Sequence, residues 1–348
     1  MAGAVKRLRV LVLVHESLVP PDSIDHLTDQ EADEFRTEFD VIKTLRELGH
    51  DVRPLGIGDS LAGLRTGITE WKPHVCFNLL EEFGGIVTYD QYVVAYLELM
   101  RQPYTGCNPR GMILSRDKTL SKQLLTFHRI PTPKFALFRR GQRARTARRL
   151  RYPLFVKSAT EDASLGIAQA SVVEDEARLR ERIEFIHEQT RSDALVEEFV
   201  DGREIYVGVI GNERLTLFPP WELTFGSPGA SALGIATRKV KWDRAYQERH
   251  AIATGPAKDL PAGVAEVLGR MTRRIYRALH MSGYARMDFR LRADGSLFVL
   301  EANANPNLAA QEDLGRSAAH GGVGYQRLVE RIISLGMGYQ AEWRESPE

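Results

Sequence analysis

The sequence predicts an α/β protein that begins with a doubly wound parallel sheet. Apolar runs typical of buried strands, at residues 8–14 and 74–80, alternate with helical periodicity, as in residues 31–48. Farther along, residues 283–307 show two strands of alternating polarity joined at Asp294-Gly295, which predicts an antiparallel hairpin. We therefore expect a parallel N-terminal sheet followed by a part with antiparallel strands.

The N-terminal elements follow a strand–helix–strand order. After the strand at 8–14, residues 31–48 carry apolar side chains at helical spacing, and Gly49 suits the position just after a helix. Strands are expected at 51–57 and again at 74–80, after Pro73. No G-x-G-x-x-G motif follows the first strand, so the sequence gives no support for dinucleotide binding.

The second half alternates between strands and helices. A helix at 117–127 must end before the Pro131-Thr132-Pro133 segment. The arginine-rich stretch at 139–151 is interpreted as a solvated surface, in preference to an anion-binding patch. The elements expected after it are a strand at 154–159, a helix at 174–189, strands at 194–200 and 204–210, an irregular region at 221–258 and a helix at 262–280.

Bulk composition excludes several classes of function. A chain of 348 residues suggests two or three domains. Its net charge of +1 gives no support for nucleic acid binding. Two cysteines are too few for a disulfide framework, and no apolar run is long enough to span a bilayer. The apolar run at 10–14 lacks the cleavage pattern of a signal peptide, so we expect a cytoplasmic protein with no membrane partner.

The hairpin carries the polar residues of greatest interest. With a loop of two or four residues, Asp288 lies opposite Glu301 and Arg286 lies opposite Asn303, whereas a three-residue loop breaks this register. Side chains alternate along a strand, so these four would share one face. The other face, which we expect to be the core face, would carry Ala285, Met287, Phe289, Leu291, Phe298, Leu300 and Ala302.

This polar face predicts a metal site. Two carboxylates directly opposite each other repel unless a cation lies between them. Two carboxylates and an amide oxygen are hard ligands that suit Mg²⁺. The alternative is a solvated strand face with incidental charges, and the dense polar sequence Glu-Ala-Asn-Ala-Asn-Pro at 301–306 favours the metal site.

Two lysines upstream point to a nucleotide. Lys118 begins a helix, and Lys157 lies near the end of a strand. The segment at 160–166, which contains Ser164, is small and can present backbone N–H groups to phosphate oxygens. Each lysine alone would be interpreted as a surface residue. Together with a divalent cation, however, they supply the positive charge that a triphosphate needs.

The run at 194–204 predicts an adenosine site. The backbone of Glu197, Glu198, Phe199 and Val200 can offer donors and acceptors to an adenine edge, and Glu204 can accept both ribose hydroxyls. Taken alone, the run would be interpreted as an exposed acidic strand end.

The order of these elements resembles the ATP-grasp carboxylate–amine ligases, and within them the D-alanine–D-alanine ligases, over residues 8–335. The motifs that carry the resemblance are Y-T-G at 104–106, D-K at 117–118, P-L-F-V-K at 153–157, V-E-E-F-V-D-G-R-E at 196–204, R-M-D-F at 286–289 and L-E-A-N-A-N-P at 300–306. The resemblance implies an ATP-grasp fold whose ATP-binding part is α+β. We divide it into an N-terminal domain at 1–115, a central domain at 116–200 and a C-terminal domain at 201–348.

The resemblance also implies residue roles. Lys118 and Lys157 would hold ATP phosphates, with Ser164 in the same cofactor site. Glu197 would take the adenine amino group, the backbone of Val200 would contact adenine, and Glu204 would bind ribose. Two Mg²⁺ ions, with Mn²⁺ as the alternative, would be bound by Asp288, Glu301 and Asn303. Arg286 and the backbone near Asn307 would stabilise the phosphoryl group and the oxyanion. Lys239 or Lys241 would be a lid lysine near the γ-phosphate.

The substrate-facing residues depart from the D-alanine ligase pattern. Ala163 stands where the first of two serines is usual, and Glu81-Glu82 replaces a His-Gly pair. Glu312-Asp313 lies near the acceptor position, and an acidic rim does not suit an anionic acceptor. The ATP half therefore looks intact, whereas the amino-acid half looks altered.

The resulting hypothesis is an ATP-dependent ligase that joins a small carboxylate, such as an amino acid, to an amine through an acyl phosphate. The alternatives are a D-alanine–D-alanine ligase that makes cell-wall precursors, a phosphotransferase with a hydroxyl acceptor, and a nucleotide-binding regulatory protein without turnover. Small-molecule substrates are the expected partners, and a homodimer is usual for the family resembled.

Overall fold

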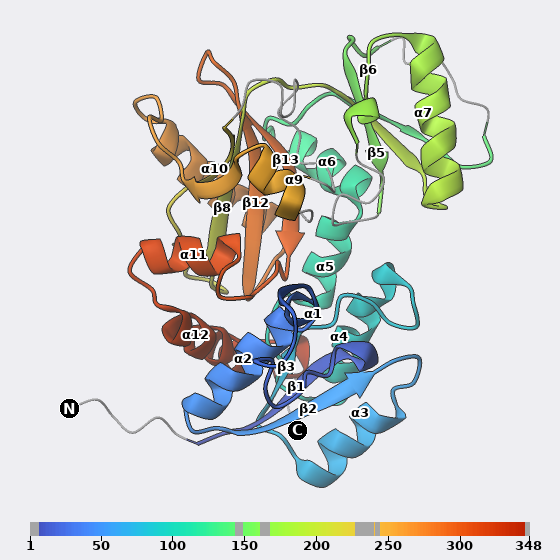
Figure 1. Cartoon of the computed structure of the whole chain (residues 1–348). Helices are drawn as coiled ribbons and strands as arrows, with labels where there is room; N and C mark the ends of the chain where they lie inside the picture. Colours follow the sequence, from blue (N-terminus) through green and yellow to red (C-terminus); the bar gives the residue numbers. More distant parts are fainter. Residues whose placement is uncertain (1–6, 143–148, 161–167, 227–239, 241–243, 345–348) are drawn as a thin grey trace.

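The computed structural model describes residues 7–142, 149–160, 168–226, 240 and 244–344. Three sheets lie around two consecutive helices, α5 (Pro109–Arg116) and α6 (Lys118–Phe127) (Figure 1). The first sheet comes from the N-terminal third of the chain, the second from its middle and the third from its C-terminal part. Each of the three predicted domains thus contains one sheet, although the exact boundaries stay a prediction.

The N-terminal sheet is parallel, which confirms the prediction. Its strands β1 (Arg9–His15), β2 (Asp51–Ile57) and β3 (Val75–Asn78) have the order β2-β1-β3. The helix expected at 31–48 is divided into α1 (Asp29–Glu34) and α2 (Arg36–Glu47). A capping box of Thr28 and Glu31 begins α1, which stabilises it as a separate short helix.

Both faces of this sheet are covered by helices. The connections that follow the strands contain α3 (Ala62–Thr66) and α4 (Asp90–Leu99). The C-terminal helix α12 (Tyr325–Gly338) returns to pack against α2 and β3. Its buried apolar side chains join those of α2 in one cluster with alternate residues of β1. The end of the chain therefore completes the core of its beginning.

The central sheet is antiparallel and small. Its strands β4 (Phe135–Phe138), β5 (Leu154–Ser158), β6 (Val172–Val173) and β7 (Ala194–Glu198) have the order β4-β7-β5-β6. The helix α7 (Glu176–Gln189) buries one side of its length against this sheet. Lys157 and Glu197 point away from that packed face, because their neighbours Val156 and Val196 belong to the α7 cluster.

The C-terminal sheet contains the predicted hairpin. Its strand order is β11-β10-β8-β12-β13, and β9 also pairs with β8. The bounds are β8 (Arg203–Ile210), β9 (Thr216–Leu217), β10 (Trp221–Phe225), β11 (Ile252–Pro256), β12 (Tyr284–Leu291) and β13 (Leu297–Ala304). The helices of this part are α9 (Arg244–Arg249), α10 (Val264–Ala278) and α11 (Asp313–His320).

The prediction of an irregular region at 221–258 is wrong at both of its ends. Strands β10 and β11 pair antiparallel at the edge of the sheet, with Trp221 opposite Pro256. The strand β11 reads Ile-Ala-Thr-Gly-Pro and lacks the alternation of apolar and polar residues that identifies a half-buried strand. An edge strand tolerates such residues because only one of its sides needs partners.

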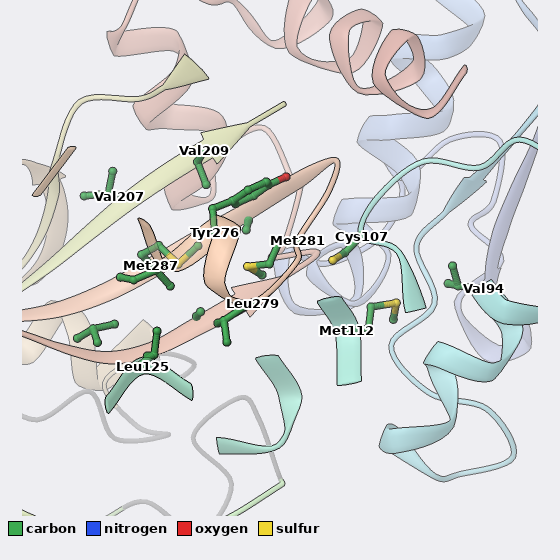
Figure 2. Packing of buried hydrophobic residues seen from close by; sticks show 14 of the residues in the cluster. Val94, Cys107, Met112, Leu125, Val207, Val209, Tyr276, Leu279, Met281 and Met287 are labelled. Atoms are coloured by element: carbon green, nitrogen blue, oxygen red, sulfur yellow. The ribbon is translucent and has the colours of Figure 1, made fainter. Parts of the chain in front are cut away.

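One apolar core runs beneath the hairpin and on toward the N-terminal part. Figure 2 shows Met287 of β12 beside Val207 and Val209 of β8, with Tyr276 and Leu279 from the end of α10 close by. The same cluster continues through α5 and α6 to the α4 helix of the N-terminal part. The buried side of the hairpin is therefore anchored on several elements, which holds its polar face in a fixed place.

No helix in the described part of the chain is long and apolar enough to cross a membrane.

Candidate active site

The hairpin places its polar residues as predicted. Asp288 lies opposite Glu301, and Arg286 lies opposite Asn303. The loop is nevertheless different from the one expected, because Leu291 pairs with Leu297 and residues 292–296 connect them. That odd-length loop would misalign the strands, but a β-bulge next to Asp288 restores the register.

The bulge also corrects the predicted core face of β13. Leu300 is the extra residue, since Glu301 pairs with Asp288 while Val299 pairs with Phe289. Between the bulge and the loop, the residues that enter the core are Leu297 and Val299, both buried, instead of the predicted Phe298 and Leu300. Shifting a strand by one residue exchanges its two faces, which accounts for the difference.

Arg286 and Asp288 form a two-point contact. The Arg286 Nε and Nη2 atoms lie 2.8 and 2.9 Å from the two carboxylate oxygens of Asp288. The guanidinium also lies over the Tyr206 ring at 4.7 Å and 3.8 Å from Asp313. Burial lowers the pKa of Arg286, but the neighbouring carboxylates of Asp288 and Asp313 outweigh it and raise the pKa well above its usual value. Arg286 is a permanent, oriented cation.

The donor atoms of this face fit a magnesium ion. Asn303 donates its Nδ2 hydrogen to Asp288 at 3.1 Å, which leaves the amide oxygen of Asn303 free to act as a ligand. The described residues contain no group of three or more acidic, histidine or cysteine side chains that could form an all-protein metal cage. Two carboxylates and an amide instead suit Mg²⁺, whose other ligands are substrate phosphates and water.

Lys118 lies beside this face although the two are far apart in sequence. It is the first residue of α6, where Asp117 caps the helix. A small pocket is lined by residues of α5 and α6, including Arg116 and Lys118, and by Glu301 and Asn303 of β13. A predicted phosphate-binding lysine and two predicted metal ligands therefore share one pocket.

Lys157 and Glu197 also meet. The Lys157 Nζ atom lies 3.2 Å from Glu197 Oε2, and both side chains are almost fully buried. A second lysine, Lys122, lies 2.5 Å from Glu197 Oε1. Burial raises the pKa of Glu197, but the two lysines outweigh burial and lower it below its usual value. The sequence interpretation missed Lys122, although its spacing of four residues from Lys118 puts both on one face of the helix.

Glu204 has two partners of its own. Its Oε2 atom lies 3.0 Å from Arg290 Nη2, and its Oε1 atom accepts a hydrogen bond of 2.8 Å from the Tyr206 hydroxyl. Arg290 was also missed, although it follows Asp288 by two residues and so must share its face. The ribose role of Glu204 stays a prediction.

The adenine segment leaves β7 at Glu198. The Glu198 carboxylate accepts a hydrogen bond of 3.0 Å from the Arg151 N–H, and the Phe199 N–H donates to the Pro153 carbonyl at 3.0 Å. Val200 follows outside the strand, and its backbone role is likewise a prediction. Of the other predicted cofactor residues, Ser164 and Lys241, together with the alternative Lys239, lie outside the described residues.

Asn307 holds the exit loop of the hairpin against the N-terminal part. Its Oδ1 atom accepts hydrogen bonds of 2.8 Å from the Thr37 hydroxyl and 2.8 Å from the Ala309 N–H. Both lone pairs of this oxygen are in use, so the side chain fixes the loop, and the catalytic role of the backbone N–H groups near Asn307 stays a prediction.

Acidic side chains gather where the N-terminal part meets this loop. Glu38 of α2 is buried, and burial raises its pKa to about 7, with a further increase caused by the nearby Glu81. Burial and the adjacent Asp313 also raise the pKa of Glu312. Glu81, Glu312 and Asp313, which the sequence singled out, therefore interact with other acidic side chains, and their role at the acceptor position stays a prediction.

Comparison with known proteins identifies the family. Residues 124–334 match the family model described as the D-ala D-ala ligase C-terminus. The chain is 35% identical over 295 residues to a D-alanine–D-alanine ligase of Nitratidesulfovibrio vulgaris, covering 85% of this chain and 90% of that protein. The chain belongs to the D-alanine–D-alanine ligase family. Another relative, the uncharacterized protein y4sG of Sinorhizobium fredii, is 33% identical over 307 residues and covers 85% of both chains.

Solved structures of this family share the fold. The D-alanine–D-alanine ligase of Bacillus anthracis complexed with ATP superposes with a TM-score of 0.73 at 21% identity, covering 95% of this chain and 97% of that one. The VanG D-Ala:D-Ser ligase of Enterococcus faecalis gives a TM-score of 0.71 at 19% identity, covering 95% and 100%. The predicted ATP-grasp fold is confirmed, and this member of the D-alanine–D-alanine ligase family is an ATP-dependent ligase that uses ATP and Mg²⁺.

Proposed function

We propose that this D-alanine–D-alanine ligase family member forms an amide bond between a carboxylate and an amine, releasing ADP and phosphate. The observation that carries the proposal is the polar face of the hairpin. There, the oriented guanidinium of Arg286 lies in direct contact with Asp288, opposite Glu301 and Asn303. A fixed cation beside a cation-binding carboxylate pair suits a reaction in which negative charge moves from a phosphate to an acyl oxygen.

Two chemical steps account for the products. The donor carboxylate attacks the γ-phosphorus, which breaks its bond to the β,γ-bridging oxygen and gives an acyl phosphate and ADP. The amine then attacks the acyl carbon, loses a proton and displaces phosphate. Arg286 would stabilise the charge on the phosphoryl oxygens in the first step and the tetrahedral oxyanion in the second.

The other residues of the site bind and orient. Lys118 and Lys157 would hold the phosphates, and Glu197 would hold the base. When bound at Asp288, Glu301 and Asn303, magnesium would screen the repulsion between the triphosphate and the donor carboxylate. Glu204, set by Arg290 and Tyr206, would accept hydrogen bonds from the ribose.

The substrate pair is the finer part of the proposal. The name of the relative at 35% identity favours D-alanine in both positions. The acidic side chains Glu38, Glu81 and Glu312 favour an acceptor that lacks a free carboxylate, because an anion bound beside them would raise the already raised pKa values of Glu38 and Glu312 further. We therefore propose an amino acid as donor and an uncharged or cationic amine compound as acceptor, with D-alanyl-D-alanine synthesis as the competing assignment.

Phosphate release from ATP tests both the ligase reaction and the proposed substrate pair. The purified chain is incubated with ATP, Mg²⁺ and paired pools of amino acids and amines, and each reaction is examined for phosphate and for a new amide. Release that requires both an acid and an amine supports the ligase. Phosphate retained on the product would identify a phosphotransferase, and ATP binding without turnover would identify a regulatory protein. Activity confined to two D-alanines would remove the proposed acceptor class and leave the ligase assignment intact.

A further inference from the structure

Lys122 is a buried lysine with two fixed contacts. Its side chain is only 2% exposed, and its Nζ atom lies 2.5 Å from Glu197 Oε1 and 2.9 Å from the Thr132 hydroxyl oxygen. Thr132 in turn donates its hydrogen to the Val299 carbonyl at 3.2 Å. Val299 is also the residue before the β-bulge, so the ammonium connects α6, β7 and β13. Its direction is set by elements from two sheets.

A lysine in this position carries an energetic cost. Burial lowers the pKa of Lys122 to about 8, although Glu197 partly offsets this. Lys157 already supplies Glu197 with one cation at 3.2 Å. Replacing buried ion pairs by apolar side chains is often neutral or stabilising, so stability alone gives a weak reason for a second cation. A role in placing the Glu197 carboxylate gives a stronger one.

The Glu197 carboxylate can accept a further donor. Lys122 Nζ lies 2.5 Å from Oε1 and Lys157 Nζ lies 3.2 Å from Oε2, so each oxygen has one ammonium neighbour. A carboxylate oxygen carries two lone pairs and can accept a second hydrogen bond. Within the described residues, no hydrogen bond to Oε1 is present beyond this ion-pair contact. An N–H group of a bound ligand can take the second position.

We propose that Lys122 is a positioning residue that makes the nucleotide site select a base with an amino group at C6. This rests on the proposed contact between Glu197 and the base. Lys122 and Lys157 grip the two carboxylate oxygens separately, which prevents rotation of the carboxylate and keeps it charged. The open lone pair on Oε1 accepts the amino hydrogen of adenine. Hypoxanthine presents a carbonyl oxygen at C6, which the fixed negative charge repels.

Nucleotide binding without the other substrates tests this directly. Dissociation constants of ATP and ITP, each with Mg²⁺, are measured by calorimetry for the wild type and for Lys122→Met. We expect the wild type to prefer ATP by on the order of 30-fold, since ATP makes a hydrogen bond to the charged Glu197 that ITP lacks. In Lys122→Met the preference should fall by about tenfold, because ATP binds more weakly while the affinity for ITP changes little. Lys134→Met, an exposed change in the next segment, should behave as the wild type.

Two outcomes would overturn the assignment. One is a Lys122→Met protein that loses affinity for ATP and ITP equally, as a purely structural lysine would. The other is an unchanged ATP preference. If Lys122→Met fails to fold, Thr132→Val decides, because it keeps every charge and removes only one anchor of the ammonium. It should reduce the ATP preference by about threefold, and an unchanged preference there would also contradict the proposal.

The result is separable from the proposed ligase reaction. A wild type that prefers ATP over ITP but releases no phosphate with any acid and amine would contradict the amide-forming reaction and leave the Lys122 assignment standing. A wild type that forms amides equally well with ATP and ITP would support the amide-forming reaction and contradict the Lys122 assignment.

Discussion

Asp288 and Glu301 face each other across the hairpin next to Leu300, which is an extra residue in β13. The loop at 292–296 sets one register near the turn, and the bulge changes it before the polar face begins. Bulges next to active sites commonly redirect a side chain in this way. The alignment of the proposed metal-binding pair therefore depends on the local register of β13, which a single deletion can test.

Deleting Leu300 should remove the bulge and leave Glu301 opposite Asp288, because Val299 would still pair with Phe289 and Glu301 would become the next residue of the ladder. We expect the deletion variant to keep activity within about tenfold of the wild type, because the proposed metal-binding pair stays aligned. Circular dichroism and gel filtration should report a folded protein. The matched control is Leu300→Ala, which keeps the residue count and should retain most activity. A folded deletion variant that has lost turnover would show that the bulge itself, and not the pairing alone, positions Glu301.

Glu301→Gln should increase the magnesium requirement of the reaction. The change keeps the shape of the side chain but removes one of the two charges that would attract the ion. We expect the rate at limiting Mg²⁺ to fall by about 10²-fold and to recover partly as Mg²⁺ is raised. The measurement is a magnesium titration of phosphate release, with the exposed Glu266→Gln on α10 as the control. An identical titration curve for Glu301→Gln would exclude the residue as a ligand.

Much of this site followed from the spacing of residues. Alternation along β12 and β13 placed Asp288, Glu301 and Asn303 on one face, and the parallel order of β1 and β3 followed from their apolar runs. The features of the hairpin that could not be predicted are those in which one irregularity compensates for another. An odd-length loop and a bulge cancel each other, so the predicted pairing was right while the predicted loop and part of the core face were wrong.

Buried charges were the other difficulty. Lys122 and Arg290 look like ordinary surface residues in the sequence, yet each is paired with a buried glutamate from a different element, Glu197 of β7 and Glu204 of β8. Their positions could be assigned to a helix face or a strand face, but periodicity does not indicate which charged residue of another element lies opposite. Such pairs become visible only once the sheets are assembled.

Arg290→Met should destabilise the fold, and a second change should reverse the effect. Arg290 is 5% exposed and holds Glu204 at 3.0 Å and the Gly202 carbonyl at 2.7 Å. Removing it leaves a buried carboxylate without its cation, which costs about 3–5 kcal/mol. Adding Glu204→Gln should recover at least half of that loss. Urea unfolding of the two single variants and the double variant measures the coupling, and additive effects would show that the pair is not linked.

Glu38→Gln should change how stability depends on pH. The folded pKa of Glu38 is about 7, compared with an ordinary value of 4.5, because burial disfavours the charged form. Below pH 4.5 the group is protonated in both states and costs nothing. As the pH rises from 4.5 to 7 the unfolded chain releases the proton first, so stability falls, and above pH 7 the loss levels off at about 3 kcal/mol.

The glutamine variant lacks this titration. Relative to the wild type, it should gain about 2–3 kcal/mol of unfolding free energy between pH 5 and pH 8. Urea unfolding at the two pH values measures the difference, and Glu34→Gln, an exposed change one turn earlier in the chain, should show no such gain. A Glu38→Gln advantage that is the same at both pH values would mean that the carboxyl titrates normally. The carboxyl would then be hydrated and charged at neutral pH, and no raised pKa would support an acceptor without a carboxylate.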